Sequence, residues 1–519
     1  MKSQKNIVNI INFLRGWSPD SDIVKPVRED IRILGSLGLK STFLLEYDVF
    51  NNPEIMEQVR AAGPLFEIGC WFEIVQPLVE DAGLSWRGGA PWDSAANIAF
   101  ALGYTVQERK KLADTYMKRF HEEFGYYPEV VGAWMLDGIL LEYLEEKYNI
   151  TAACICRDQY GTDGYNLWGG YYSQAYYPAK KNMLCPAQTA TEQINIPLFR
   201  MLGPDPVRQY DCGLIDERGK VKPSDWQGVI TMEPAYPKYG GNPVWVDWFL
   251  RENFSGKALG FSYVQIGQEN SFQWEKVGEG LEYQYPEVAK LQSEGKLTVE
   301  HLSESGRWFR ENFKTSPVCS LPFESDWRGK GAKSYWFYSR FYRINCYFEN
   351  GYMRMRDLQK FDENYADRYY NAPGLSHSCL YDDLPIMDGY KFSKEDFCAA
   401  GRLFCGNNEI RIDNVSEFTD RENNIMSIIA KTGNGEIKII CSEDGIEITA
   451  DECEIELRLD GALENFKDVA VDSDCRRLRL THNGYDYSLE LEKGRFSTEN
   501  EIGILSEDKT IKINFCDKK

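Results

Sequence analysis

TAACICRDQYGTDGYNLWGGYYSQAYYP, residues 151–178, joins a short apolar run to a long irregular segment. Residues 151–155 are mostly apolar on consecutive positions, as expected of a strand buried on both faces of a parallel sheet. From Cys156 to Pro178, glycines, carboxylates and aromatic rings follow without a helical or strand period, which predicts a long, ordered loop. Flat rings beside carboxylates suit a ligand with apolar faces and many hydroxyl groups, such as a sugar. The alternative is a loop that packs its tyrosines beneath itself.

The same kind of apolar run recurs along the first 275 residues, with helical segments between the runs. Alternation of strands and helices predicts a parallel α/β sheet, and the absence of a dinucleotide-binding fingerprint favours a closed or nearly closed (β/α)7 TIM-like barrel. The expected strands are Ile7–Leu14, Ser41–Leu45, Leu65–Phe72, Val130–Leu136, Thr151–Ile155, Gly228–Met232 and Phe261–Ile266. The expected helices include Val27–Leu37, Pro53–Ala62, Thr105–Phe124, Ile139–Tyr148 and Thr298–Phe313.

The character of the chain changes after the barrel. The polar stretch Gly280–Gly295 is interpreted as the linker that leaves it. After Gly389, short alternating segments separated by Gly, Asn and Asp predict an antiparallel β-sandwich. The expected strands there are Glu409–Val415, Ile425–Thr432, Gly435–Cys441, Gly445–Ala450, Glu454–Leu459, Arg477–His482, Tyr485–Glu490 and Lys509–Phe515. We therefore predict a barrel over residues 1–315, a mixed connecting segment over 316–388 and a β-sandwich accessory domain over 389–519.

Composition excludes several classes of partner. The 519 residues carry a formal net charge of -21, which disfavours binding to nucleic acid. No stretch predicts a transmembrane helix, and the N-terminus lacks the features of a signal peptide, so we expect a cytoplasmic protein with no membrane partner. The 14 cysteines are scattered and are expected to be buried free thiols. No zinc-type cysteine spacing occurs, and we predict neither a metal nor a cofactor.

Candidate site residues follow the strands, because active sites of α/β barrels lie at the carboxyl ends of their strands. Nearly every predicted strand ends in a carboxylate or an aromatic ring, and the second ends at Glu46 and Asp48. Burying a carboxylate after an apolar strand costs free energy unless the carboxylate is paired with a cation or has a role in a functional site. The residues expected to bind substrate are Arg15, Trp71, Glu73, Trp134, Asp158, Asp163, Trp168, Gln268 and Trp274.

Carboxylates facing one another across a barrel mouth suggest cleavage of a glycosidic bond. One acts as the acid, the other as nucleophile or base, and crowding raises the pKa of the acid. Glu269, which follows the last strand, is the first choice, with Glu233 and Asp137 as further catalytic candidates. The structural alternatives are a helix cap for Asp137, before Gly138, and a helix-start acid for Glu269.

The phrases KSTFLLE (residues 40–46) and LFEIG (65–69), with the strand count, resemble the glycoside hydrolase/deacetylase superfamily of (β/α)7 barrels. EIGCWFEI (67–74), AGLSWRGG (82–89), TDGYNLWGGYYSQAYYP (162–178) and IGQENSF (266–272) are similar to an uncharacterised gut-bacterial family that pairs a barrel with a C-terminal β domain. The superfamily's retaining glycosidases place a nucleophile after strand four and an acid near strand seven. That resemblance implies Asp137 and Glu269 here.

The sequence departs from the metal-dependent deacetylases of that superfamily. Those enzymes carry an Asp pair after strand one and a histidine motif after strand three, whereas this chain has Leu14-Arg15-Gly16 and no histidine near Glu73. We therefore expect a glycoside hydrolase acting on an oligosaccharide or glycoside. The alternatives are a metal-assisted deacetylase-like enzyme and a non-catalytic carbohydrate-binding protein. A homo-oligomer is a further possibility, which the sequence does not decide.

Overall fold

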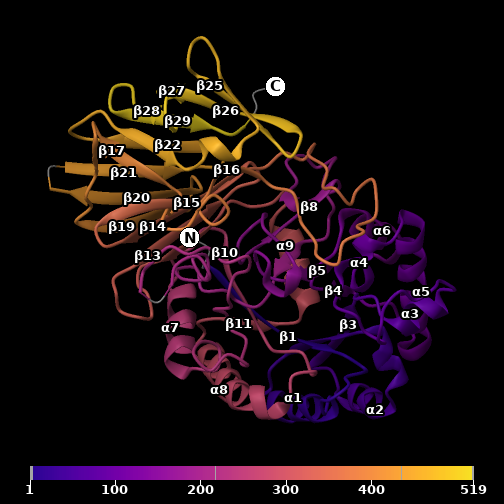
Figure 1. Cartoon of the computed structure of the whole chain (residues 1–519). Helices are drawn as coiled ribbons and strands as arrows, with labels where there is room; N and C mark the ends of the chain where they lie inside the picture. Colours follow the sequence, from indigo (N-terminus) through magenta and orange to yellow (C-terminus); the bar gives the residue numbers. More distant parts are fainter. Residues whose placement is uncertain (1–3, 217, 434, 517–519) are drawn as a thin grey trace.

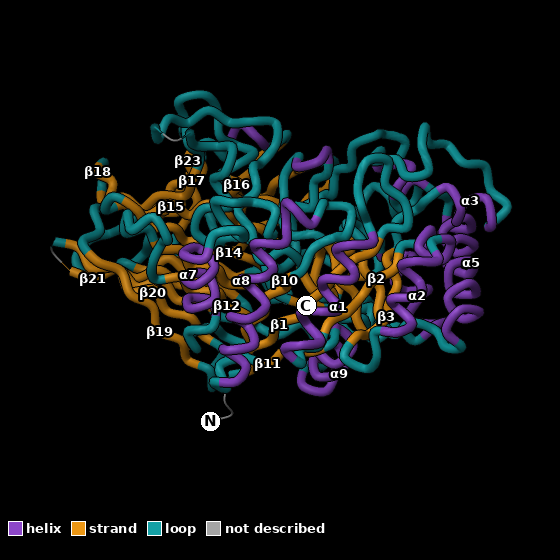
Figure 2. Tube along the Cα trace, turned by 90° about the horizontal axis from the view of Figure 1, so that it is seen from below, coloured by secondary structure: helices purple, strands orange, loops and turns teal. Residues whose placement is uncertain are grey.

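A computed structural model describes residues 4–216, 218–433 and 435–516. Figure 1 shows a helix-ringed sheet built from the first part of the chain, with a layered β region, built from the last part, packed against it. Figure 2 shows the same division from below, with the helices α2, α3 and α5 at one end and strands such as β19, β20 and β21 at the other. Within the described residues, no helix is long and apolar enough to cross a membrane.

A curled, mainly parallel sheet forms the first part. Its strands are ordered β10-β1-β2-β3-β4-β5-β9, with antiparallel β6 (Ala175–Tyr176) beyond β9, and β11 (Thr298–Glu300) beside β1. The bounds are β1 (Lys5–Leu14), β2 (Ser41–Leu45), β3 (Phe66–Trp71), β4 (Val130–Gly132), β5 (Ala152–Ile155), β9 (Leu198–Arg200) and β10 (Phe261–Ile266). These bounds confirm all but one of the predicted strands, because consecutive apolar side chains fill both faces of each strand.

The predicted strand Gly228–Met232 is wrong. Its backbone bonds to loop atoms instead of a strand: Asp205 N donates to Ile230 O at 2.9 Å, and Met232 N donates to Leu202 O at 2.9 Å. Ile230 and Met232 are buried, which explains the apolar signal. The sixth parallel strand is β9, which had no strand prediction.

The sheet is a half-barrel and does not close by a backbone ladder, so the expectation of a closed barrel is corrected to this coarser architecture. The edges β9 and β10 are not paired with each other in the sheet. Side chains bridge them instead: Leu202 N donates to Gln265 Oε1 at 2.6 Å, and the rings of Phe199 and Tyr263 lie 4.9 Å apart.

Helices cover the outer face of this sheet. They are α1 (Val24–Leu37), α2 (Pro53–Ala61), α3 (Gln76–Asp81), α4 (Ala96–Ala99), α5 (Val106–Phe124), α6 (Gly138–Tyr148), α7 (Pro243–Asn253), α8 (Trp274–Ser293) and α9 (Leu302–Asn312). The predicted start of α5 is confirmed by a capping box, in which Thr105 and Glu108 satisfy each other's free backbone amides.

The prediction that Gly280–Gly295 is a linker is wrong, because most of it belongs to α8. Val277, Leu281, Tyr285 and Val288 recur at helical spacing and are buried along one face of this helix. The predicted helix Thr298–Phe313 is divided between β11 and α9.

Two antiparallel sheets form the last part of the chain. The ten-stranded sheet holds β12 (Cys319–Phe323), β13 (Lys333–Tyr338), β14 (Tyr342–Glu349), β15 (Tyr352–Lys360), β16 (Leu384–Asp388), β17 (Ala400–Cys405), β18 (Asn408–Glu409), β23 (Glu456–Asp460), β27 (Arg495–Ser497) and β28 (Ile502–Leu505). The eight-stranded sheet holds β19 (Asn414–Asp420), β20 (Ile425–Thr432), β21 (Gly435–Cys441), β22 (Gly445–Ala450), β24 (Asp468–Val471), β25 (Arg477–His482), β26 (Tyr485–Lys493) and β29 (Thr510–Asn514). The predicted strand Glu409–Val415 is wrong, because β18 and β19 only touch its ends.

The ten-stranded sheet is buried on both faces. Along β13, Tyr335 and Phe337 belong to the core shared with the eight-stranded sheet, whereas Trp336 and Tyr338 belong to the core of the half-barrel. Alternate side chains along β13 thus pack into different cores, so this one sheet joins the two parts of the chain. Strands from residues 316–388 share that sheet with strands after residue 389. We therefore propose that the two segments function as one unit beside the half-barrel of residues 1–315.

Candidate functional site

The candidate site is organised around the guanidinium group of Arg15, which follows β1. Its Nε donates to Glu269 Oε2 at 3.0 Å, and its Nη1 donates to Glu46 Oε1 at 2.8 Å and to Glu73 Oε2 at 3.0 Å. The ring of Trp92 lies 4.7 Å from the guanidinium carbon, and its Nε1 also donates to Glu73 Oε2 at 3.1 Å. Three carboxylates from different strand ends thus converge on one buried cation.

The fold brings these residues together because β10, β1, β2 and β3 are neighbours and parallel. Their carboxyl ends meet at one edge, as expected for parallel strands. Side chains fix the segment after β10: Gln268 N donates to Asn12 Oδ1 at 2.9 Å, and Arg15 N donates to Asn270 Oδ1 at 2.8 Å. A side chain at Gly267 would come within 2.3 Å of Ile11 O, so this turn requires glycine.

The group around Arg15 carries more negative than positive charge. Glu46 Oε2 and Glu73 Oε1 are buried, and neither has a hydrogen-bond partner among the described residues. Burial, followed by the nearby carboxylates of Asp48 and Glu73, raises the pKa of Glu46 well above its ordinary value, although Arg15 opposes this effect. A raised pKa makes protonation of Glu46 easier, and a proton there would reduce the repulsion within the group.

A second pair of acids, Glu233 and Asp163, is influenced by the charge of Glu269. Burial raises the pKa of Glu233 to about 7, and the charges of Asp163 and Glu269 add to this effect against Thr231 and Arg157. Thr231 Oγ1 donates to Glu233 Oε2 at 2.8 Å, which fixes that carboxyl group. Burial, together with the charge of Glu269, also raises the pKa of the Asp163 carboxyl group, while Arg157 opposes it. The charges of Asp163 and Glu269 therefore act on Glu233, and the charge of Glu269 acts on Asp163.

Three polar atoms in this region remain available to a ligand. Among the described residues, no hydrogen bond engages Glu269 Oε1, Glu233 Oε1 or Arg15 Nη2, and none of these atoms is completely buried without a partner. Glu269 keeps 13% of its side chain exposed. The site therefore offers two carboxyl oxygens and one guanidinium N–H to substrate.

Sequence reasoning missed two members of this site. Trp92, in the loop between α3 and α4, stacks on Arg15, and Arg157, shortly after β5, moderates the pKa of Glu233 and Asp163. The position of Arg157 after an apolar strand was the available signal. Glu46 and Asp48 were expected at a strand end but were not chosen as site residues.

The structure moves Asp137 out of the proposed catalytic group. Its Oδ1 accepts from Leu140 N at 3.0 Å, which caps α6, and from Arg109 Nη1 at 2.9 Å. Asp137 and Arg109 are both almost completely buried. None of the described contacts of Asp137 involves Glu269. The structural alternative accounts for its Oδ1, whereas its Oδ2 is buried without a hydrogen-bond partner among the described residues.

Replacing Asp137 by asparagine is expected to lower the free energy of unfolding by about 2 kcal/mol, because Arg109 loses a buried charge partner while the cap acceptor stays. Turnover by the folded protein should change less than twofold. Urea unfolding and turnover measured on the same preparations check this. A turnover loss of a hundredfold or more without destabilisation would return Asp137 to the catalytic group.

The structure also corrects the sugar-binding interpretation of the loop over residues 156–178, whose rings pack between the two parts of the chain. Asp158 binds Arg343 of β14, and both side chains are buried. Trp168 is 2% exposed and lies against Tyr210, with ring centroids 5.2 Å apart. Tyr172 stacks on Trp336 at 4.2 Å. Asp158 and Trp168 are therefore packing residues, and Asp163 is the carboxylate of this loop that reaches the site.

The remaining candidates differ in access. Trp71 is fully buried and stacks on Phe13, with ring centroids 4.2 Å apart, so its ring cannot stack on a sugar. Trp134 is half-buried, with its ring edge against Phe13. The backbone N–H of Gln268 donates to Asn12 Oδ1. Trp274 is the first residue of α8; it is half-buried and packs against Gly278. Trp134, Gln268 and Trp274 stay predicted substrate-binding residues.

The residues present do not fit the divalent metal of the metal-dependent deacetylases. No group of three or more His, Cys, Asp or Glu side chains in the described part of the chain is arranged to hold a metal ion. The guanidinium group of Arg15 already stands among the carboxylates at the ends of β2, β3 and β10, and it would repel a second cation there.

No protein-family model and no curated protein sequence matches this chain. Its fold is similar to the crystal structure of a "putative glycoside hydrolase/deacetylase" from Parabacteroides distasonis, with a TM-score of 0.51 and 15% identity over 69% of this chain and 86% of that chain. This likeness confirms the resemblance in fold. A "putative polysaccharide deacetylase" from Mycobacterium smegmatis is more distant, with a TM-score of 0.33 and 12% identity over 60% of this chain and 92% of that chain.

Proposed function

We propose that this protein is a carbohydrate-active hydrolase that cleaves glycosidic bonds with Glu233 and Glu269. The observation that carries the proposal is that two carboxyl groups in unequal surroundings are electrostatically coupled, since the charge of Glu269 helps to raise the pKa of Glu233. Glu233 is buried with a pKa near 7, whereas Glu269 is partly exposed and bound to Arg15. Two acids in unequal surroundings are what glycosidic cleavage requires, because one must donate a proton while the other stays ionised.

In this proposal Glu233 protonates the leaving-group oxygen of the glycoside. Its Oε2 is anchored by Thr231, so Oε1 is the atom that faces substrate. Glu269 acts through Oε1 on the opposite side of the bond, as nucleophile or as the base that activates water. Arg15 binds Glu269 Oε2 at 3.0 Å and holds that carboxyl group at the end of β10.

Asp163 and Trp134 would position the sugar. The charge of Asp163 helps to raise the pKa of Glu233, which keeps the acid protonated near neutral pH. The half-buried ring of Trp134 offers a face for stacking, and Arg15 Nη2 offers a donor to a hydroxyl group.

Turnover is expected to fall as the pH rises through about 7, because Glu233 must be protonated to act as the acid and loses its proton there. Replacing Asp163 by asparagine removes a neighbouring negative charge, which should lower the pKa of Glu233 and move this limb of the profile to lower pH. Initial rates between pH 4 and pH 9 for the wild type and Asp163→Asn test this. If the descending limb of the pH–rate profile has the same midpoint in Asp163→Asn as in the wild type, the charge of Asp163 does not influence the pKa of Glu233.

Hydrolytic deacetylation is the second candidate, favoured by the fold likeness to the Parabacteroides protein. It would use the same acids, with Glu269 activating water and Glu233 protonating the leaving nitrogen or oxygen. The test is to incubate the wild-type protein with aryl glycosides and with acetylated chito- and xylo-oligosaccharides, while assaying reducing ends and free acetate in parallel. Reducing ends or released aryl alcohol would support the glycosidase, and acetate alone would support the deacetylase. If no substrate yields either product, the glycosidase proposal and the deacetylase alternative are both contradicted.

A further inference from the structure

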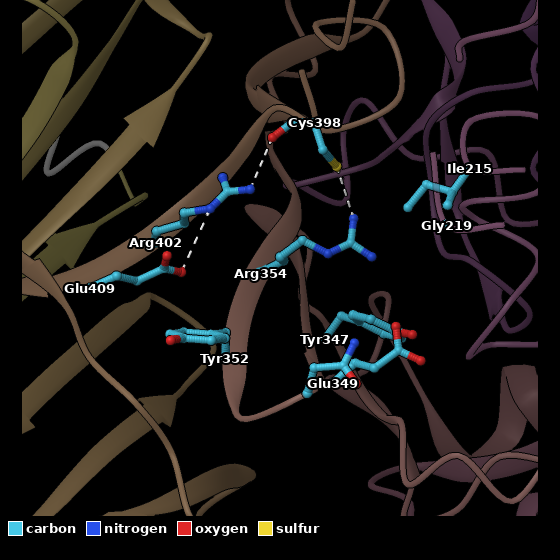
Figure 3. A pocket seen from close by; sticks show the side chains of 10 residues that line it. Ile215, Gly219, Tyr347, Glu349, Tyr352, Arg354, Cys398, Arg402 and Glu409 are labelled. Atoms are coloured by element: carbon cyan, nitrogen blue, oxygen red, sulfur yellow. Dashed lines mark hydrogen bonds and ion pairs between the residues drawn. The ribbon is translucent and has the colours of Figure 1, made fainter. Parts of the chain in front are cut away.

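A hollow lies on the half-barrel side of the ten-stranded sheet, beside the buried ring of Tyr347. Its volume is about 350 Å³. Figure 3 shows Tyr352, Arg402 and Glu409 on one side of it and Ile215 and Gly219, from the loop before α7, on the other. It therefore lies between the two parts of the chain, a common location for ligand sites.

The ring of Tyr352 is the most exposed aromatic group of this hollow, with 39% of the residue exposed. A smaller hollow of about 120 Å³ adjoins it and shares Glu349, Asn350 and Tyr352 with it. The ring thus stands on a ridge between two depressions. Among the described residues, no side chain or backbone group hydrogen-bonds the Tyr352 hydroxyl group or the Asn350 amide.

The backbone beneath this ridge is rigid. Tyr352 pairs with Glu349 in the hairpin between β14 and β15, whose turn is Asn350-Gly351 with φ of 56° and 82°. Ile412 N donates to Gly351 O at 2.8 Å and ties the turn to the segment after β18. The ring is therefore presented in one position, and a ligand that stacks on it would not have to order the loop first.

The charges around the hollow are paired. Arg354 binds Asp211 at 2.6 Å, Arg402 lies 3.7 Å from Glu409 and 3.6 Å from Asp460, and Glu349 binds Arg208 at 2.8 Å. No charge of either sign predominates, so the surface favours a neutral ligand. An open hollow with an exposed ring and many paired polar groups matches a ligand that has apolar faces and hydroxyl groups.

We propose that the ridge formed by Asn350 and Tyr352 is a non-catalytic binding site for a neutral oligosaccharide that crosses from one hollow to the other. The Tyr352 ring stacks on a sugar face, and the free hydroxyl and amide groups bind sugar hydroxyls. The choice of a carbohydrate rests partly on the proposed function. The site itself is separate from the carboxylates at the strand ends, because the two share no lining residue.

The test measures binding of xylotetraose, cellotetraose and N-acetylchitotetraose to the full chain by isothermal titration calorimetry. Glu269→Gln in every sample prevents turnover. At least one probe should bind, and Tyr352→Ala should weaken that binding about tenfold, the loss expected for one stacked ring. Tyr352→Phe should retain most of the affinity, and Asn350→Gly keeps the turn while removing the amide. Phe418→Ala is the control, because Phe418 of β19 is an exposed ring (60%, against 39% for Tyr352) that lines neither hollow.

Equal affinity of Tyr352→Ala and the parent protein for every probe that binds would overturn the proposal, as would the absence of binding by all three. Binding lost in Trp134→Ala but kept in Tyr352→Ala would place the sugar at the strand ends, and that result also contradicts it. If Tyr352→Ala alone loses binding and the wild type hydrolyses nothing, the ridge stands while the proposed glycosidase function fails.

Discussion

Replacing Glu233 by glutamine is expected to reduce turnover about 10²–10⁴-fold at pH 6, because the amide cannot donate the proton that an unactivated leaving group needs. The loss should be much smaller for an aryl glycoside whose leaving group is already a weak base. Replacing Glu269 by glutamine should abolish turnover of both substrates, because the nucleophile or base is required whatever the leaving group. Rates of the two variants on the two substrate classes measure this difference.

The matched control is Glu67→Gln, a glutamate of β3 that accepts from Thr42 Oγ1 at 2.8 Å and is not among the described contacts of Arg15. Its turnover should stay within twofold of the wild type. Equal losses for Glu233→Gln on good and poor leaving groups would exclude Glu233 as the acid.

Replacing Arg343 by methionine is expected to lower the free energy of unfolding by about 3–5 kcal/mol, the cost of leaving buried charges without their partner. Arg343 of β14 donates to Asp357 Oδ1 and Oδ2 at 2.9 and 2.8 Å and also binds Asp158, in the loop after β5. The side chains of Arg343, Asp158 and Asp357 are all almost fully buried. Urea unfolding followed by intrinsic tryptophan fluorescence measures the loss, because Trp168 and Trp336 lie beside this arginine.

A matched control is Arg479→Met. Arg479 of β25 forms an exposed ion pair with Asp472, and its loss should lower the free energy of unfolding by less than about 1 kcal/mol. Adding Asp158→Asn and Asp357→Asn to Arg343→Met should recover part of the stability, because no unpaired carboxylate then remains. An unchanged unfolding midpoint in Arg343→Met would contradict the view that this ion-pair group joins the two parts of the chain.

Six strands of the half-barrel could be predicted from their apolar runs, whereas the short β9 (Leu198–Arg200) was missed, and α5 could be predicted from its capping box. Gly228–Met232 misled the prediction because a buried loop has the same apolar signal as a strand, and only its hydrogen-bond partners distinguish the two. Helix α8 was missed because its surface is rich in Glu and Gln, and Pro286 lies within it. Its buried positions at helical spacing were the signal against the linker interpretation.

Strand-end positions pointed to Arg15, Glu73 and Glu269 as candidate site residues, whereas Glu233 follows a buried loop segment, and the roles of these residues could not be predicted. Asp137 and Asp158 resemble Glu233 and Glu269 in sequence context, since all four follow apolar runs. What distinguishes Asp137 and Asp158 from Glu269 is access to solvent. All three pair with a distant arginine, but the side chains of Asp137 and Asp158 are 3% and 1% exposed, whereas Glu269 keeps 13% of its side chain exposed. This burial depends on the tertiary fold.

The central claim is that the acids at the strand ends work with Arg15 as their cation and need no metal ion. The most direct test is turnover of the best substrate after exhaustive chelation, followed by addition of Zn²⁺, Co²⁺ or Mn²⁺. The account predicts glycosidic cleavage at the same rate in the stripped and the supplemented protein, and its loss in Glu269→Gln under both conditions. Activity that disappears on chelation and returns with one of these ions would contradict the account.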